Sequence, residues 1–212
     1  MQTAQAAFWN RIARRYAATP MRNPEAWEAT LDRVRAHLAS GARVLELGCG
    51  TGSTALRLAP GVAGYTGTDD AGEMVAIARE RLAETPVSGL AFTEGRTGDG
   101  SLPDGPFDAI LAFNLLHLVP DLPAALTEAR GLLKPGGLLI TKTPCLGGSR
   151  WAALWPVVGA LRLVGKAPPL SFVSPRGLER IIEAAGFEIL ERGDYPKSPP
   201  SRFVVARTAA GG

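Results

Sequence analysis

The chain has 212 residues, of which 46% are hydrophobic and 20% are charged, and its formal net charge is +3. This composition is typical of one globular domain, here 1–212, and the absence of a long basic block makes nucleic acid an unexpected partner. Two cysteines without metal-like spacing exclude a disulfide framework, predict no metal site, and indicate a reducing, cytoplasmic compartment.

Along the chain, apolar residues alternate between helical and strand periodicities. The N-terminus lacks the apolar core of a signal peptide, and the longest apolar stretch, 151–165, is too short to span a bilayer. We expect the tail 208–212 to be disordered. In chain order, the expected helices are 23–40, 53–59, 72–85, 121–133 and 174–185, and the expected strands are 44–47, 64–68, 90–94, 107–113, 138–143, 187–191 and 203–207.

Strands that alternate with helices of about a dozen residues predict an α/β fold: a three-layer sandwich whose mostly parallel sheet has helices on both faces. In such sheets, ligands bind at the carboxyl ends of the strands. The glycines that follow the first strand, together with Asp69, Asn114 and Thr143, all fall at those ends. Their convergence predicts a single binding site.

The segment VLELGCGTG (44–52) runs from a buried strand into a loop with glycine at every second position. Glycine lets a backbone approach a ligand closely because it has no Cβ. The acidic pair Asp69 and Asp70 ends the next strand and is spaced to reach a ribose, so we expect an adenosine-bearing cofactor. A dinucleotide fingerprint would have its third glycine at Ser53, which weakens but does not remove an NAD-dependent oxidoreductase as an alternative.

Four successive segments, VLELGCGTG, GTDDAGEMVAIAR, FDAILAFNLLHLVPD and LLKPGGLLI, resemble the motifs of S-adenosylmethionine-dependent methyltransferases with a seven-stranded Rossmann-like sheet. They cover 44–143, and AAGF at 184–187 also fits. WNRIARRYA at 9–17 is similar to the opening of the small-molecule branch that includes ubiquinone and menaquinone C-methyltransferases. The resemblance implies S-adenosylmethionine as cofactor, a last strand that is antiparallel, and an N-terminal flap over 1–23.

The glycines are expected to contact the aminoacyl and ribose parts of this cofactor. Glu46 matches the family's carboxylate for the cofactor ammonium, with a structural role as the alternative. Asp69 can accept two hydrogen bonds from the ribose diol, whereas Asp70 is an alternative helix cap. The full set of expected cofactor-binding residues is Tyr16, Glu46, Gly48, Cys49, Gly50, Thr51, Gly52, Asp69, Asp70, Met74, Arg96, Thr97, Phe113 and Asn114.

Two of these positions have open alternatives. Met74 is placed to lie against the adenine face, but a methionine at helical spacing is equally expected in the core. Arg96 stands where the family often has aspartate, so either Arg96 stacks on the ring, Thr97 and backbone supply the contact, or Asp99 reaches inward.

His117 follows the central strand, where the reacting methyl group should lie. A histidine neutral at pH 7 could remove a proton from an acceptor, but the family often has histidine here without using it as a base, so a packing or capping role is favoured. His37, the only other histidine, is expected at the surface.

The segment 144–173 departs from the alternation of strands and helices and is expected to set acceptor specificity as an apolar lid. An interfacial helix over 151–165 that contacts a membrane is the alternative. The expected function is methyl transfer to a small, apolar or aromatic, lipid-like acceptor by a monomer or homodimer. A non-catalytic protein that binds S-adenosylmethionine is the rival hypothesis.

Overall fold

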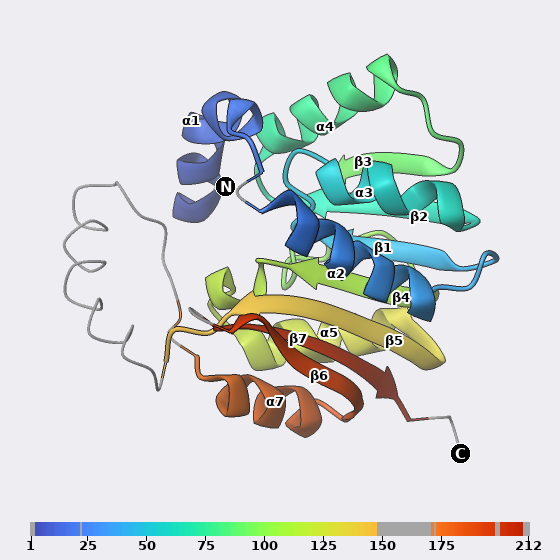
Figure 1. Cartoon of the computed structure of the whole chain (residues 1–212), viewed down its shortest axis with the longest axis vertical. Coiled ribbons are helices and arrows are strands. Elements are labelled where there is room, and N and C mark those ends of the chain that lie inside the picture. The colour runs from blue at the N-terminus through green and yellow to red at the C-terminus, as the bar shows by residue number, and fades with distance from the viewer. Residues whose placement is uncertain (1–2, 22, 148–170, 172, 198–199, 210–212) are drawn as a thin grey trace.

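The computed structural model describes residues 3–21, 23–147, 171, 173–197 and 200–209. Strands and helices alternate through most of this chain (Figure 1). The helices are α1 (Ala4–Ala18), α2 (Pro24–His37), α3 (Ser53–Leu58), α4 (Gly72–Glu84), α5 (Leu122–Leu132) and α7 (Pro175–Ala184), with 3₁₀ turns η1 (Ala59–Gly61) and η2 (Leu116–Leu118). The strands are β1 (Arg43–Leu47), β2 (Gly64–Asp69), β3 (Leu90–Glu94), β4 (Phe107–Phe113), β5 (Leu133–Pro144), β6 (Phe187–Lys197) and β7 (Pro200–Thr208).

All seven strands form one sheet in the order β3-β2-β1-β4-β5-β7-β6. Neighbours from β3 to β5 are parallel, whereas β7 is antiparallel to both β5 and β6. The expected seven-stranded sheet with an antiparallel last strand is therefore confirmed. Strand order reverses at β1, which lies between β2 and β4, and this is where such sheets bind ligands.

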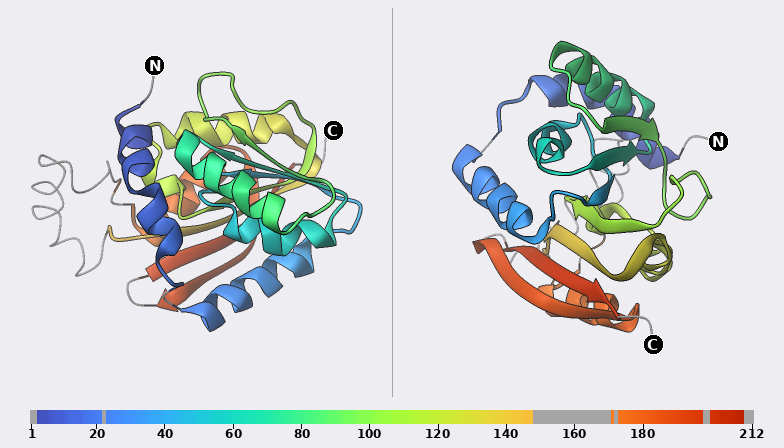
Figure 2. Two further views of the ribbon diagram at one scale, coloured as in Figure 1. Left: turned by 90° about the horizontal axis from the view of Figure 1, so that it is seen from above. Right: turned by 90° about the vertical axis from the view of Figure 1, so that its right-hand side faces the viewer.

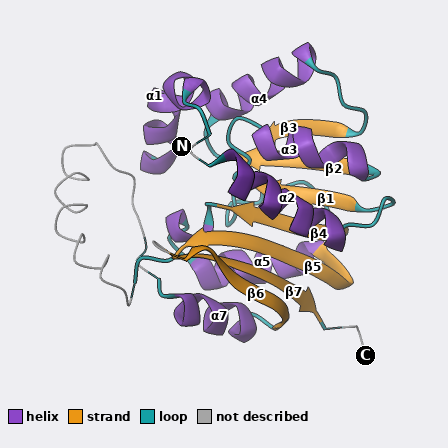
Figure 3. Cartoon of the chain, viewed as in Figure 1, coloured by secondary structure: helices purple, strands orange, loops and turns teal. Residues whose placement is uncertain are grey.

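Helices cover both faces of the sheet, as Figures 2 and 3 show. On one face, α2, α3 and α4 bury side chains such as Leu31, Leu58 and Val75 against the sheet. On the other, α5 and α7 bury Leu126 and Ile182. The central strand β4 alternates between the two clusters and is buried on both sides, which explains its continuous apolar sequence.

Three helices begin at a polar residue that a proline follows one or two positions later. The side chains of Asn23, Asp121 and Ser174 accept hydrogen bonds from backbone N–H groups three residues later, at 3.0 Å in each case. Each cap satisfies an N–H group that would otherwise lack a partner in the first turn. The helix starts at these positions were therefore predictable from the sequence.

Some boundaries differ from the expectation. β5 begins at Leu133 rather than at 138, because Leu133 already pairs with Phe107. The register then shifts before Leu138 pairs with Ala109, so the Lys-Pro-Gly-Gly segment is an irregularity within the strand. β6 extends to Lys197 rather than ending at 191, and it includes Pro196 as an edge strand, where proline is tolerated. The segment 1–23, expected to be a flap, contains a 15-residue helix, α1, capped by Thr3.

The apolar segment 151–165, most of the expected lid 144–173 and the end of the expected disordered tail 208–212 lie outside the described residues. No helix in the described part of the chain has the length and apolarity required to cross a membrane.

Candidate functional site

The turn after β1 places three glycines in the left-handed region of backbone conformation. Gly48, Gly50 and Gly52 have φ of 66°, 54° and 77°. We call Gly48–Gly52 the glycine loop. Residues with a Cβ rarely adopt this backbone conformation, so the alternating glycines are what permit the turn. The loop leaves β1 at its carboxyl end and feeds directly into α3.

The three glycines differ in what surrounds them. A Cβ on Gly48 would lie 2.8 Å from Leu115 Cδ1, and one on Gly52 would lie 2.7 Å from Phe92 Cζ and 3.0 Å from Ala78 Cβ. These two positions are therefore filled by protein. A Cβ on Gly50 would meet no atom of the described chain within 4 Å. The open space at Gly50 is where a ligand can approach the backbone.

Asp69 ends β2 and is bonded to the glycine loop. Its Oδ2 accepts a hydrogen bond from the Gly50 amide at 2.9 Å, and its Oδ1 accepts one from the Ala71 amide at 2.9 Å. Burial raises the pKa of this carboxyl, and the two amide hydrogen bonds oppose that rise. Each carboxylate oxygen has a second lone pair, so Asp69 can still accept hydrogen bonds from a diol.

Glu46 lies inside the sheet beneath the loop, with only 2% of its surface exposed. The Tyr65 hydroxyl of β2 donates a hydrogen bond to its Oε2 at 2.9 Å. Burial raises the pKa of Glu46 to about 7, although the bond from Tyr65 lowers it. The sequence motif singled out Glu46 but not Tyr65, because nothing in the pattern of a buried strand marks which residue of its neighbour reaches across.

We predict that Glu46→Gln changes how stability depends on pH. The pKa of Glu46 is higher in the folded chain than its usual 4.5, so its contribution to stability is complete below pH 4.5 and is lost as pH rises through 7. That displacement corresponds to about 3 kcal/mol. Urea unfolding from pH 5 to 8 should show Glu46→Gln gaining stability relative to the unmodified protein as pH rises. Parallel profiles for the two proteins would contradict this prediction.

Asp70 does not cap α4, whose N-cap residue, Ala71, makes no side-chain capping bond. The carboxylate instead accepts a 2.6 Å hydrogen bond from Thr3 Oγ1 and lies 3.7 Å from Arg96 Nη1. Arg96 also pairs with Asp99 at 2.9 Å. The expected adenine end is thus bordered by a charged cluster joining β2, the loop after β3 and the start of α1, with Thr97 half-buried beside Arg96.

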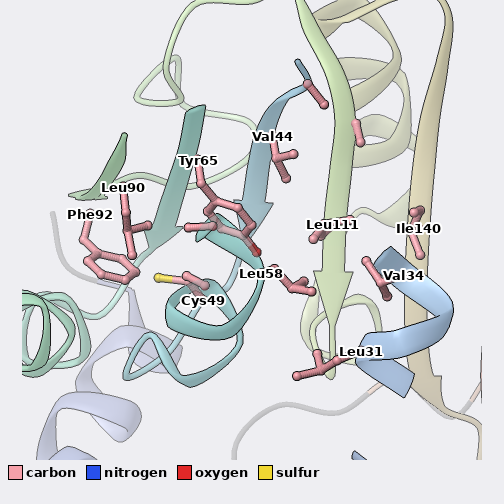
Figure 4. Packing of buried hydrophobic residues seen from close by; sticks show 14 of the residues in the cluster. Leu31, Val34, Val44, Cys49, Leu58, Tyr65, Leu90, Phe92, Leu111 and Ile140 are labelled. Atoms are coloured by element: carbon pink, nitrogen blue, oxygen red, sulfur yellow. The ribbon is translucent and has the colours of Figure 1, made fainter. Parts of the chain in front are cut away.

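Two other expected ligands take part in packing. Met74 is 2% exposed and packs with Ala13 and Trp9 of α1, which favours the core alternative. The Cys49 side chain points toward Phe92 in the buried cluster of Figure 4, and burial raises the pKa of its thiol well above the usual value. The Cys49 amide is bonded to Thr68 O at 2.8 Å.

The carboxyl end of β4 places three expected site residues next to the loop. Phe113 is half-buried against the core, and Asn114 is exposed with φ of 54°, held by an amide bond to Lys142 O at 2.8 Å. Burial lowers the pKa of His117 to about 4, so its ring is neutral at pH 7. Its buried Nδ1 has no hydrogen-bond partner in the structure as described.

Thr51 of the glycine loop is linked to α4, whereas Tyr16 belongs to α1. Thr51 is 5% exposed, and its hydroxyl accepts a 2.9 Å hydrogen bond from Arg81 Nη1. Tyr16 is 51% exposed and contacts Trp9 edge-on, with 5.8 Å between ring centroids. Arg81 was not expected from the sequence, since an arginine on a helix is ordinarily a solvated surface residue.

The chain is similar to known methyltransferases in both sequence and fold. A family model described as a methyltransferase domain matches residues 17–192. A fatty-acid O-methyltransferase of Mycolicibacterium smegmatis is 39% identical over 102 residues, covering 47% of this chain and 36% of that protein. A ubiquinone biosynthesis O-methyltransferase of Methylocella silvestris is 31% identical over 162 residues, covering 73% of this chain and 61% of that protein.

Among solved structures, magnesium protoporphyrin IX methyltransferase from Synechocystis, with bound SAH, superposes with a TM-score of 0.70 at 20% identity, covering 98% of this chain and 96% of that one. At this identity the match shows the fold alone. The chain spans about a third to three fifths of the length of the two curated relatives described above.

Proposed function

Because this chain belongs to the family of S-adenosylmethionine-dependent methyltransferases, we propose that it transfers the methyl group of that cofactor to a small acceptor. The observation that carries the proposal is the Asp69–Gly50 pair. It sets a carboxylate beside a glycine whose missing Cβ leaves open space at the switch point of the sheet. These residues fit a nucleoside, because a diol can bond to the carboxylate while the sugar lies over Gly50.

The residues of the chain then bind the cofactor and orient it. Asp69 accepts hydrogen bonds from the ribose hydroxyls, and Glu46 accepts one from the cofactor ammonium directly or through water. The backbone of Gly48–Gly52 lies against the cofactor. When bound, S-adenosylmethionine supplies an activated methyl group on a sulfonium. The protein therefore has only to align the acceptor and exclude water. Such positioning lowers the activation barrier by on the order of 7–11 kcal/mol.

We propose an apolar or aromatic, lipid-like acceptor that is methylated on oxygen. Two relatives are named O-methyltransferases, one of them for fatty acids. Burial keeps the His117 ring neutral at pH 7 but makes it a weak base, so we propose that its unbonded Nδ1 orients the acceptor by a hydrogen bond rather than by removing its proton. Ser171, near the end of the proposed lid segment, lies at this position, since its amide donates a 2.7 Å hydrogen bond to His117 O.

We expect His117→Asn to lower kcat about tenfold, the effect of losing one orienting hydrogen bond of about 1.4 kcal/mol. The matched control is His37→Asn, which removes the only other histidine. His37 ends α2, and its Nε2 lies 2.9 Å from Glu191 Oε2. That variant should retain activity within about twofold. Equal kcat for His117→Asn and the unmodified protein would assign His117 to packing.

The function itself is tested by incubating the protein with methyl-labelled S-adenosylmethionine and a panel of fatty acids, quinol precursors and phenols. Label transferred to any of these supports the proposal. Binding of the cofactor with no transfer to any acceptor would favour the non-catalytic alternative, and binding of NADH in its place would favour an oxidoreductase.

A further inference from the structure

The guanidinium of Arg81 joins three segments that are far apart in the sequence. From α4, its Nη1 donates to Thr51 O at 3.1 Å, to Thr51 Oγ1 at 2.9 Å and to Ser53 Oγ at 2.9 Å. Its Nη2 donates to Ala17 O at 3.0 Å. One side chain therefore ties the glycine loop and the start of α3 to the end of α1.

The contact with α1 is a favourable one. Ala17 O belongs to the last turn of α1, where carbonyl groups lack partners within the helix and carry a partial negative charge. A planar, permanently charged guanidinium can satisfy this carbonyl and the Thr51 acceptors together, which a lysine ammonium cannot do as well.

The rest of α1 is docked on α4 along its length. The Glu73 amide donates to Asn10 Oδ1 at 2.9 Å, so a side chain of α1 caps the first turn of α4. Ala13 is completely buried against Met74 and Ile77. At the other end, Thr3 is bonded to Asp70. The N-terminal end of α1 therefore contacts the acidic motif of the proposed site at Asp70. Its C-terminal end is linked to the glycine loop through Arg81.

We propose that Arg81 is a positioning residue that couples docking of α1 to the conformation of the glycine loop. Thr51 lies between Gly50, which faces the ligand space, and Gly52, which is packed under Phe92. By fixing both the carbonyl and the hydroxyl of Thr51, Arg81 holds the loop in the form that Gly50 needs. Coupling of this kind is reciprocal, so a bound cofactor must stabilise α1 as much as docked α1 stabilises the bound cofactor.

This inference rests on the proposed function, since it concerns the affinity for the cofactor. We expect Arg81→Gln to weaken binding of S-adenosylhomocysteine about tenfold by calorimetry, within the usual range for coupled sites. Amide hydrogen exchange gives a readout independent of activity. S-adenosylhomocysteine should slow exchange in residues 4–18 of the unmodified protein and have much less effect on them in Arg81→Gln.

The matched control is Arg14→Gln, which removes an exposed ion pair with Glu80 between the same two helices but touches no part of the glycine loop. It should bind within about twofold of the unmodified protein. If Arg81→Gln does not fold, Arg81→Lys serves in its place, with binding weakened at least threefold. Unchanged affinity in the Arg81 variant, or no effect of the ligand on exchange in 4–18, would overturn the inference. Failure of the unmodified protein to bind would instead overturn the proposed function.

Discussion

Replacing Asp69 with alanine should raise the Kd for S-adenosylhomocysteine about a thousandfold. The substitution removes the proposed acceptor of the ribose hydroxyls and also the carboxylate that holds the Gly50 amide at 2.9 Å. Hydrogen bonds to a charged group contribute about 1.5–3 kcal/mol each, so losing two amounts to about 4 kcal/mol of binding. Calorimetric titration of the purified variant gives this value directly.

Asp108→Ala is the control for this result. Asp108 also accepts a hydrogen bond from a backbone amide, that of Arg43 at 2.8 Å, and pairs with Lys134 at 2.7 Å. It lies at the amino end of β4, whereas the glycine loop follows the carboxyl end of the neighbouring parallel strand β1. Both variants should lose stability, but only Asp69→Ala should lose binding. Similar affinities in the two variants would remove Asp69 from the site.

Alanine at Gly50 should abolish detectable binding while leaving the protein folded. The backbone there has φ of 54°, which costs an alanine about 1–2 kcal/mol, but the added methyl group meets no described atom. The methyl group would instead occupy the space proposed for the cofactor. By contrast, Gly52→Ala should reduce the free energy of unfolding by about 2–5 kcal/mol, because strain adds to a clash with Phe92.

Gly136→Ala provides a control matched in both conformation and space. Gly136 has φ of 74° and likewise no atom within 4 Å of an added Cβ, but it lies in the first residues of β5, remote from the loop. Its loss of stability should equal that of Gly50→Ala, measured by urea unfolding, with binding unchanged. If Gly50→Ala binds S-adenosylhomocysteine as Gly136→Ala does, the space over Gly50 is not the cofactor site.

The parts of the fold that the sequence predicts are those set by local chemistry. Asn23, Asp121 and Ser174 cap helices through bonds that span three residues, and the apolar run of β4 reflects burial on both faces. Alternating glycines predict the turn for the same reason, since the required conformation is a property of single residues. The caps and the turn are decided within a few residues, and the burial of β4 is recorded in its own continuous apolar run.

Features that depend on contacts between distant segments could not be predicted from local sequence patterns. Whether Met74 faces a ligand or the core depends on α1, whose position relative to α4 no local pattern encodes. Asp70 suggested a helix cap but bonds to Thr3, 67 residues away in sequence. The contacts of Arg81 span 28 to 64 residues, so neither periodicity nor motif spacing could single it out.

Calorimetric titration of the unmodified protein with S-adenosylhomocysteine tests the central claim most directly. The open space over Gly50 and the carboxylate bonded to its amide predict one site per chain with an affinity in the micromolar range. Absence of binding up to millimolar concentration would show that this turn does not hold a nucleoside, and the assignment of the site would be wrong.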